Sequence, residues 1–169
     1  IPIRKSISKK VKILGETALQ IIIVGGGSDQ QGFVNAVAKV ITKSSQNFHA
    51  YLITNQDQTW PLDNRFTKIP IGSDLDQIAS NVDLVFTTAS TTSFEFIARN
   101  TAVAVGCALD NQETNYEILA KQKLAFRGIV IKENLRCAKE LKAITELEKT
   151  FKQIGEVRNA QGEQVSFKL

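Results

Sequence analysis

The chain contains no methionine and few of the residues that carry metal-dependent or nucleophilic chemistry. Its 169 residues include one histidine, His49, and two cysteines, Cys107 and Cys137, which form no CxxC pair. Without a Cys/His ligand spacing, a structural zinc site is excluded, and both thiols are expected to stay free in a reducing compartment. One histidine supports no convincing Ser/His/Asp or Cys/His set. The sequence therefore predicts no metal and no cofactor, and the missing methionine predicts a fragment or processed product.

Long apolar runs and aromatic residues are also scarce. No run approaches the roughly 20 residues that cross a bilayer, and no signal peptide is recognisable, so we expect a cytoplasmic protein without a membrane span. Aromatic residues make up 7%, and several of the basic residues behind the net charge of +4 lie between positions 4 and 12. A nucleic-acid surface would interleave basic and aromatic side chains. The basic stretch is therefore interpreted as a solvated linker, and no nucleic-acid partner is predicted.

The apolar pattern alternates between strand-like and helix-like segments. Residues 1–17 are polar and read as a lead-in, and residues 18–169 are enough for one domain. Alternating strands and helices predict an α/β fold, a Rossmann-like parallel sheet with helices on both faces. Strand-to-helix loops then meet at one edge, where ligands bind. The expected strands are 18–24, 48–54, 66–69, 83–87, 102–105 and 124–131 (one or two strands, broken at Gly128), and the expected helices are 29–43, 74–79, 92–100, 110–121 and 133–153.

A glycine run at residues 25–27 follows the first expected strand. Glycines let the backbone approach a ligand, and a following helix offers free N–H groups, which suits a phosphate. The dinucleotide fingerprint G-x-G-x-x-G fails at Gln30, and residues 33 and 34 are Phe and Val where a P-loop needs Lys and Ser/Thr. The alternative is a tight turn in which Ser28 or Asp29 caps the helix.

Small hydroxyl residues crowd positions 87–93, ahead of the expected helix at 92–100. The spacing of Thr92 and Glu95 fits a capping box, which explains those two residues alone. The other hydroxyls, with free helix amides, can cradle a diphosphate. A carboxylate such as Glu95 can then accept hydrogen bonds from both hydroxyls of a ribose. Both interpretations stay open.

A third polar loop comes before the expected helix at 110–121, in which Ile118 and Leu119 are expected to face inward. Asp110 and Glu113 have capping-box spacing, while Asn111 and Gln112 bring amides that both donate and accept hydrogen bonds. Such groups suit the hydroxyls of a sugar. A capped helix with polar surface residues explains the same pattern equally well.

Together the three loops resemble a known family. The stretches GGGSD at 25–29, DLVFTTASTTSFE at 83–95 and DNQETNY at 110–116, with a closing AQGEQV at 160–165, look like the carboxy-terminal domain of the UDP-sugar hydrolase of pseudaminic acid biosynthesis. Spore-coat polysaccharide proteins belong to the same group, which is similar to the N-acetylglucosaminyltransferase of peptidoglycan synthesis. The resemblance covers roughly residues 19–165.

The resemblance implies the carboxy-terminal half of a GT-B fold, in which two Rossmann-like domains hold a UDP-sugar between them. The hydrolase's catalytic histidine belongs to the amino-terminal half, and His49 does not match it, so no catalytic residue is assigned here. The implied partners are a UDP-sugar and that amino-terminal half. The implied contacts are Gly26, Gly27 and Ser28 beside the phosphates, Thr91 and Thr92 on the diphosphate, Glu95 on the ribose, the wall from Ile71 to Leu75 beside the uracil, and Asp110, Asn111 and Gln112 at the sugar.

One departure from the family pattern favours a second hypothesis. Ala89 and Ser90 stand where the family usually has glycines, and the added Cβ atoms restrict that backbone and can crowd a phosphate. A degenerate module that binds weakly or acts as a scaffold is therefore the alternative to half of an enzyme. A flavodoxin-like regulator is a third possibility, which the glycine loop fits poorly.

Overall fold

A computed structural model describes residues 18–130 apart from positions 28, 30, 31, 46, 59, 100 and 123, and describes position 110 and residues 126–130 by their backbone alone. Predictions for the basic lead-in, the helix at 133–153, Cys137, Ser28 and the tail at 160–165 lie outside these residues. Among the helices that are described, none combines the length and apolarity needed to cross a membrane.

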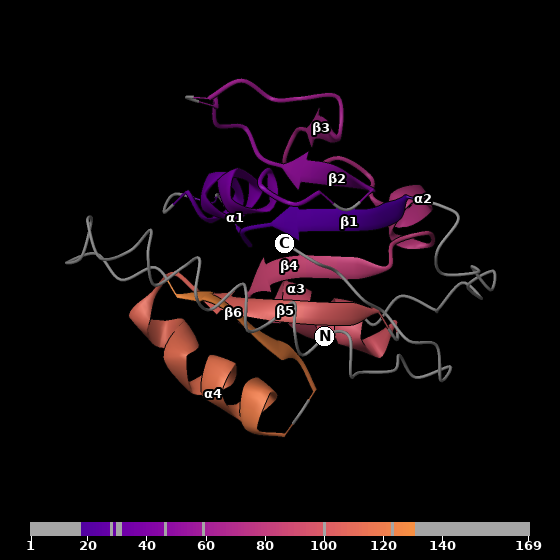
Figure 1. Ribbon diagram of the computed structural model, residues 1–169. Helices are drawn as coiled ribbons and strands as arrows, with labels where there is room; N and C mark the ends of the chain where they lie inside the picture. Colours follow the sequence, from indigo (N-terminus) through magenta and orange to yellow (C-terminus); the bar gives the residue numbers. More distant parts are fainter. Residues whose placement is uncertain are drawn as a thin grey trace.

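Within the described residues the strands form one six-stranded, fully parallel sheet. The order β3-β2-β1-β4-β5-β6 is that of the doubly wound nucleotide-binding folds, in which the chain reverses direction across the sheet between β1 and β4. Figure 1 shows β1, β2 and β4 pointing the same way, to the left. The strands are β1 Leu19–Val24, β2 Phe48–Ile53, β3 Phe66–Ile69, β4 Leu84–Thr88, β5 Ala102–Cys107 and β6 Phe126–Val130.

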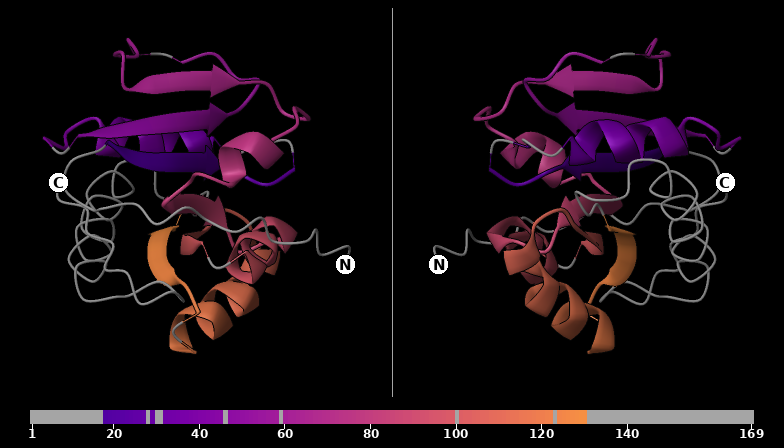
Figure 2. Two further views of the ribbon diagram at one scale, coloured as in Figure 1. Left: turned by 90° about the vertical axis from the view of Figure 1, so that its right-hand side faces the viewer. Right: turned by 90° about the vertical axis from the view of Figure 1, so that its left-hand side faces the viewer.

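Helices cover both faces of this sheet, as predicted. Helix α1 lies on one face of the sheet, and α2, α3 and α4 lie on the other (Figure 2). The side chains of each set of helices belong to a separate hydrophobic layer. The Rossmann-like α/β fold expected from the sequence is therefore confirmed. The helices are α1 Phe33–Ile41, α2 Asp76–Ala79, α3 Thr91–Ala98 and α4 Glu113–Lys121, with a short 3-10 turn, η1 Asp110–Gln112, ahead of α4.

Two hydrophobic layers follow from the alternation of side chains along the strands. Ile21 and Ile23 of β1 face the α1 layer, whereas Ile22 faces the layer of α3 and α4, and all three are fully buried. A strand buried on both faces requires a continuous apolar run. Residues 21–24 of β1 are such a run, which suits the place of β1 in the middle of the sheet.

Two details of the prediction are wrong for local reasons. Ile118 was expected to face inward but is 45% exposed, because Tyr116 and Leu119 form the buried stripe of α4. Gly128 does not break β6. The pairing of β5 with β6 shifts register between Val105 and Cys107, so the glycine lies in a bulge of a single strand.

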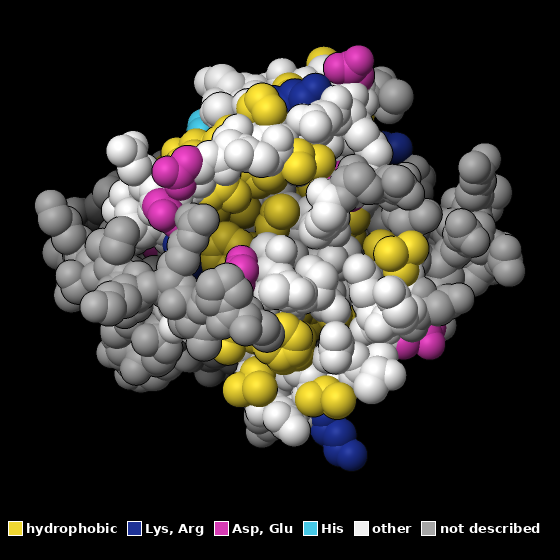
Figure 3. All heavy atoms as spheres, turned by 180° about the vertical axis from the view of Figure 1, so that it is seen from behind, with side chains coloured by type: hydrophobic (Ala, Val, Ile, Leu, Met, Phe, Trp, Pro, Cys, Tyr) yellow, Lys and Arg dark blue, Asp and Glu magenta, His cyan; other side chains and the backbone are white. Residues whose placement is uncertain are grey.

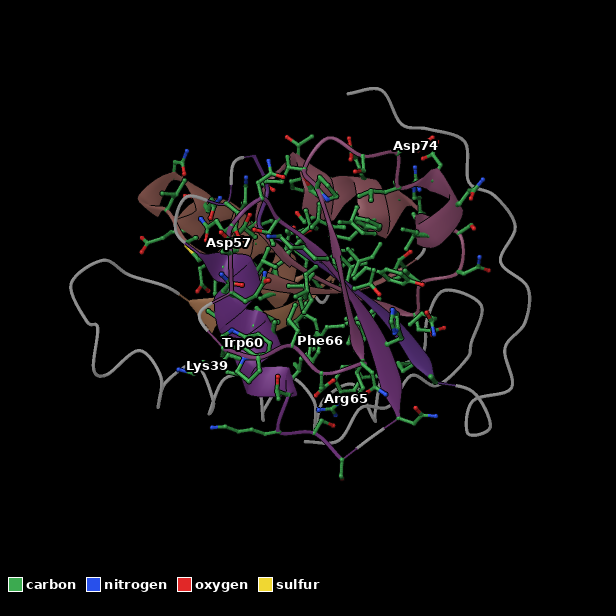
Figure 4. The ribbon with its side chains drawn as sticks, turned by 90° about the horizontal axis from the view of Figure 1, so that it is seen from above. Lys39, Asp57, Trp60, Arg65, Phe66 and Asp74 are labelled. Carbon is green, nitrogen blue, oxygen red and sulfur yellow. The ribbon has the colours of Figure 1, made fainter. Side chains whose placement is uncertain are left out.

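The carboxyl end of α1 is held by a side chain from the segment before β3. Arg65 donates to the backbone oxygens of Thr42 and Ser44, each at 2.7 Å, and its guanidinium lies 4.6 Å from the centre of the Phe48 ring. Arg65 also pairs with Asp63 at 2.8 Å. Figure 4 shows Arg65 beside Phe66 and Trp60, which cover this end of the core. A cation at the negative end of a helix is stabilising.

Candidate functional site

The loops that follow β1 and β4 meet where the strand order reverses. The Thr88 hydroxyl donates to the backbone oxygen of Gly25 at 2.9 Å. A Cβ atom added to Gly26 would lie 2.9 Å from the Ser90 hydroxyl oxygen and 3.0 Å from that of Thr88. Gly26 is therefore required by close contact between the two loops. The right-hand view of Figure 2 looks onto this edge of the sheet.

The amino end of α1 is closed by a carboxylate of the chain itself. Asp29 is 5% exposed and has a left-handed backbone, with φ of 51°. Its Oδ1 accepts from the backbone N–H of Phe33 at 2.9 Å, and both of its oxygens lie within 3.4 Å of the Val34 nitrogen. Asp29 thus caps α1, although Gly32 holds the N-cap position. These bonds confirm the alternative in which Asp29 caps the helix, and they leave the amides of Phe33 and Val34 unavailable to a phosphate.

Burial of Asp29 makes the stability of the domain pH-dependent. Desolvation raises the pKa of this carboxyl from 3.8 to about 6, against the lowering effect of hydrogen bonds from Val34 and Phe33. Between these values the folded protein binds the extra proton, so we expect the free energy of unfolding to fall as pH rises from about 4 to about 6, by about 3 kcal/mol from this group. Denaturation of the wild type and of Asp29→Asn across pH 3.5–7.5 checks this.

The asparagine variant keeps an oxygen that can accept from Phe33 and tolerates a left-handed backbone. Because it cannot ionise, it should lose this part of the pH slope and be at least as stable as the wild type above pH 7. Equal slopes in the two proteins would contradict the assignment to Asp29.

The amino end of α3, in contrast, has no side-chain cap. Ser90 holds the N-cap position with extended backbone and makes no side-chain hydrogen bond to the first turn. The predicted capping box is therefore wrong, since Thr92 is already the second helical residue and Glu95 lies exposed in the next turn. The Ser93 hydroxyl turns back to the Ser90 oxygen at 2.6 Å. Among the residues that the structure describes, no side chain bonds the first amides of α3, which lie at the edge where the loops converge.

Ala89 and Ser90 fit this turn without a glycine. Ser90 has φ of −122°, a region open to any residue. Ala89 is buried in the core layer of α3 and donates from its backbone to the Gly106 oxygen at 2.9 Å. The room that the Ser90 side chain needs is provided by Gly26 in the neighbouring loop, which has no side chain. The departure from the family pattern therefore does not strain the backbone.

The loop after β5 is organised by Gln112. Its Oε1 accepts from the backbone N–H groups of Ala108 and Leu109, at 3.0 and 3.2 Å. Gln112 also holds the N-cap position of α4, so the predicted capping box led by Asp110 is wrong. Asn111 is exposed in the 3-10 turn. Oε1 of Gln112, one of the residues predicted to face the sugar, is thus used in hydrogen bonds within its own loop.

The segment after β3 brings apolar side chains to the same region. Ile71 and Leu75 are half-buried and pack on the α3 layer together with Val24, the last residue of β1. Asp74 accepts from the backbone N–H of Asp76 at 3.0 Å and so helps to start α2. Figure 3, which views the face carrying these helices, shows hydrophobic side chains gathered over its centre.

Two further residues that connect these loops, Asn55 and Gln56, lie between the expected strands at 48–54 and 66–69 and are not among the predicted site residues. Asn55 accepts from the backbone N–H of Ile71 at 3.0 Å, and Gln56 donates to the backbone oxygen of Asp29 at 2.7 Å. The signal was an amide-rich stretch directly after a buried strand. His49 lies near the other end of β2 and bonds the Thr67 hydroxyl at 2.9 Å, away from the converging loops.

Comparison with known proteins supports the fold class. No protein-family model and no curated protein sequence matches the chain. Among solved structures, the chain is similar to the glycosyltransferase of kitacinnamycin, with a TM-score of 0.56 and 15% sequence identity over 85% of the chain. The chain spans 38% of the length of that enzyme. At this identity the likeness concerns the fold, which is glycosyltransferase-like.

Proposed function

We propose that the chain is the nucleotide-sugar-binding domain of a larger enzyme, a hydrolase or glycosyltransferase-like protein that acts on a UDP-sugar. The observation that carries the proposal is the amino end of α3. It has no side-chain cap, and it adjoins Gly26 where the strand order reverses. Doubly wound sheets bind ligands at that point, and helix amino ends attract phosphates. The likeness to a glycosyltransferase supports the same class of ligand.

In this proposal different residues around the amino end of α3 contact the diphosphate, the ribose and the base. Thr91 and Thr92 bind the diphosphate through their amides and hydroxyls, with Gly26 and Gly27 on the opposite side. Glu95 is exposed in the second turn of α3 and binds the ribose. The half-buried Ile71 and Leu75 form an apolar wall for the base.

The remaining groups serve the sugar and the leaving group. Asp110, Asn111 and the free part of the Gln112 amide face the sugar. The domain would stabilise the departing diphosphate through the helix dipole and oriented amides. An amino-terminal half with the catalytic histidine, as in the UDP-sugar hydrolase of pseudaminic acid biosynthesis, would complete the enzyme.

Replacement of Thr91 tests the site. Thr91 is exposed, so Thr91→Asp leaves the core intact, and an acid in the first turn of a helix is mildly stabilising. The negative charge of the aspartate repels a diphosphate at the same place. We expect the affinity for UDP, measured by calorimetry, to fall about tenfold or more in the aspartate variant, given the Coulomb energy of close like charges near a protein surface.

Thr91→Asn, which has the shape of Thr91→Asp without its charge, is the control and should bind UDP within about twofold of the wild type, because its side-chain amide can still donate to a phosphate in place of the hydroxyl. Unaltered UDP affinity in Thr91→Asp would place the ligand elsewhere. If the wild type binds UDP only in the millimolar range or not at all, and Glu95→Ala makes no difference to that result, the chain is the degenerate scaffold module instead.

A further inference from the structure

The turn after β2 is fixed in a way that aims two neighbouring amide side chains in different directions. Thr54 is fully buried, and its backbone N–H donates to the Ile69 oxygen at 3.0 Å. The Thr54 hydroxyl accepts from the backbone N–H of Gln56, also at 3.0 Å. The sheet and the buried Thr54 therefore fix the backbone at Asn55 and Gln56, from which the two amide side chains project.

Asn55 reaches the loop that follows β3. Its Oδ1 accepts from the backbone N–H of Ile71 at 3.0 Å, ahead of Gly72, whose φ is 91°. Ile71 packs on the α3 core layer only in part. The bond to Asn55 fixes the backbone from which this apolar side chain projects.

Gln56 reaches the loop that follows β1. Its Nε2 donates to the backbone oxygen of Asp29 at 2.7 Å, and the Gly32 N–H donates to that same oxygen at 3.0 Å. Asp29 has a left-handed backbone, which costs about 1 to 2 kcal/mol for most residues. Gln56 thus holds the backbone of Asp29 in its left-handed conformation. Asp29 belongs to the loop whose Gly26 lies against Ser90.

We propose that Asn55 and Gln56 are positioning residues that hold the base side and the phosphate side of the nucleotide site at a fixed separation. This inference rests on the proposed function. The hydrogen bonds give the two residues opposite roles, since Asn55 acts through an acceptor and Gln56 through a donor. An acid at position 55 keeps the required oxygen, whereas an acid at position 56 removes the required N–H and sets a carboxylate against a carbonyl.

The experiment compares Asn55→Ala, Asn55→Asp and Gln56→Glu with the wild type in the full chain, using UDP and inorganic pyrophosphate as ligands. Asn55→Ala should lower the affinity for UDP about fivefold, which corresponds to one ordinary hydrogen bond. The affinity for pyrophosphate should not change, because the substitution loosens only Ile71, which is part of the apolar wall for the base. Asn55→Asp should restore UDP affinity. Gln56→Glu should weaken both ligands about fivefold or more.

Hydrogen exchange in the free protein supplies a readout that needs no ligand. The Ile71 amide should exchange faster in Asn55→Ala than in the wild type and at the wild-type rate in Asn55→Asp. If Gln56→Glu does not fold, Gln56→Met, which has similar length and no charge, takes its place.

The outcomes separate the two proposals. If the wild type and all three variants bind UDP with the same affinity, the positioning role is overturned and the proposed function stands. Unchanged exchange of the Ile71 amide in Asn55→Ala would also overturn it. Wild type that binds neither ligand would overturn the proposed function and, with it, any role of this pair in ligand binding.

Discussion

Replacing Gly25 by alanine should lower the free energy of unfolding by about 2 to 4 kcal/mol, the combined cost of overpacking and of losing a helix cap. The new Cβ would lie 2.6 Å from Cγ of Asp29 and closer still to one of its carboxyl oxygens. Because that carboxyl is buried and bonded to the first amides of α1, it cannot move aside without uncapping the helix. Urea denaturation followed by circular dichroism measures the loss.

Two controls assign this loss to the carboxyl. Gly27→Ala adds the same methyl group where no atom lies within 4 Å, at φ of 52°, and should cost only the left-handed strain of about 1 to 2 kcal/mol. In an Asp29→Gly background the obstacle is gone, so Gly25→Ala should then cost less than about 1 kcal/mol. A full loss in that background would show that the methyl group collides with something other than Asp29.

Replacing Arg65 by alanine should cost about 2 to 4 kcal/mol of unfolding free energy, because two hydrogen bonds from a charged donor to backbone oxygens are lost. The bonds to Thr42 and Ser44 are both 2.7 Å long and join α1 to the segment before β3. The Arg65 side chain is only 26% exposed, so solvent replaces these bonds poorly. Thermal and urea denaturation of the purified variant test the prediction.

Arg65→Lys and Lys68→Ala distinguish geometry from charge. A lysine ammonium cannot reproduce the planar fork that reaches two carbonyls at once, so Arg65→Lys should recover less than half of the loss. Lys68 pairs with the fully exposed Asp57 at 3.3 Å, and its removal should change stability by less than about 0.5 kcal/mol. If Arg65→Lys is as stable as the wild type, charge alone accounts for the contribution of Arg65.

The parallel sheet was predictable because apolar periodicity is a property of neighbouring residues. The apolar run at residues 21–24 of β1 and the helical spacing of Phe33, Val37 and Ile41 in α1 can both be seen in the sequence, and these residues pack in the core. The close approach of the loops after β1 and β4 also follows from the topology, and the contact of Gly26 with Ser90 confirms it.

Details that depend on tertiary contacts were not predictable from local sequence. Both capping-box patterns have the right spacing, yet Ser90 and Gln112 hold the N-cap positions. Helix α3 begins earlier than its pattern predicts, whereas the 3-10 turn η1 delays the start of α4. The sequence offers Asp29 as one of two possible caps of α1, but it does not indicate the left-handed backbone from which Asp29 reaches the helix. The contacts of Asn55 and Gln56 join loops that are distant in sequence.

The carboxylate at the start of α1 restricts which ligands this domain can accept. In a dinucleotide-binding sheet the pyrophosphate rests on the helix that follows the first strand, but here an incoming anion would meet the negative charge of Asp29 and amides that are already bonded. NAD-like molecules are thereby disfavoured at that helix. The fold keeps the architecture shared with dehydrogenases, and under the proposed function the phosphates bind instead at α3, which follows β4, the strand beside β1 in the sheet.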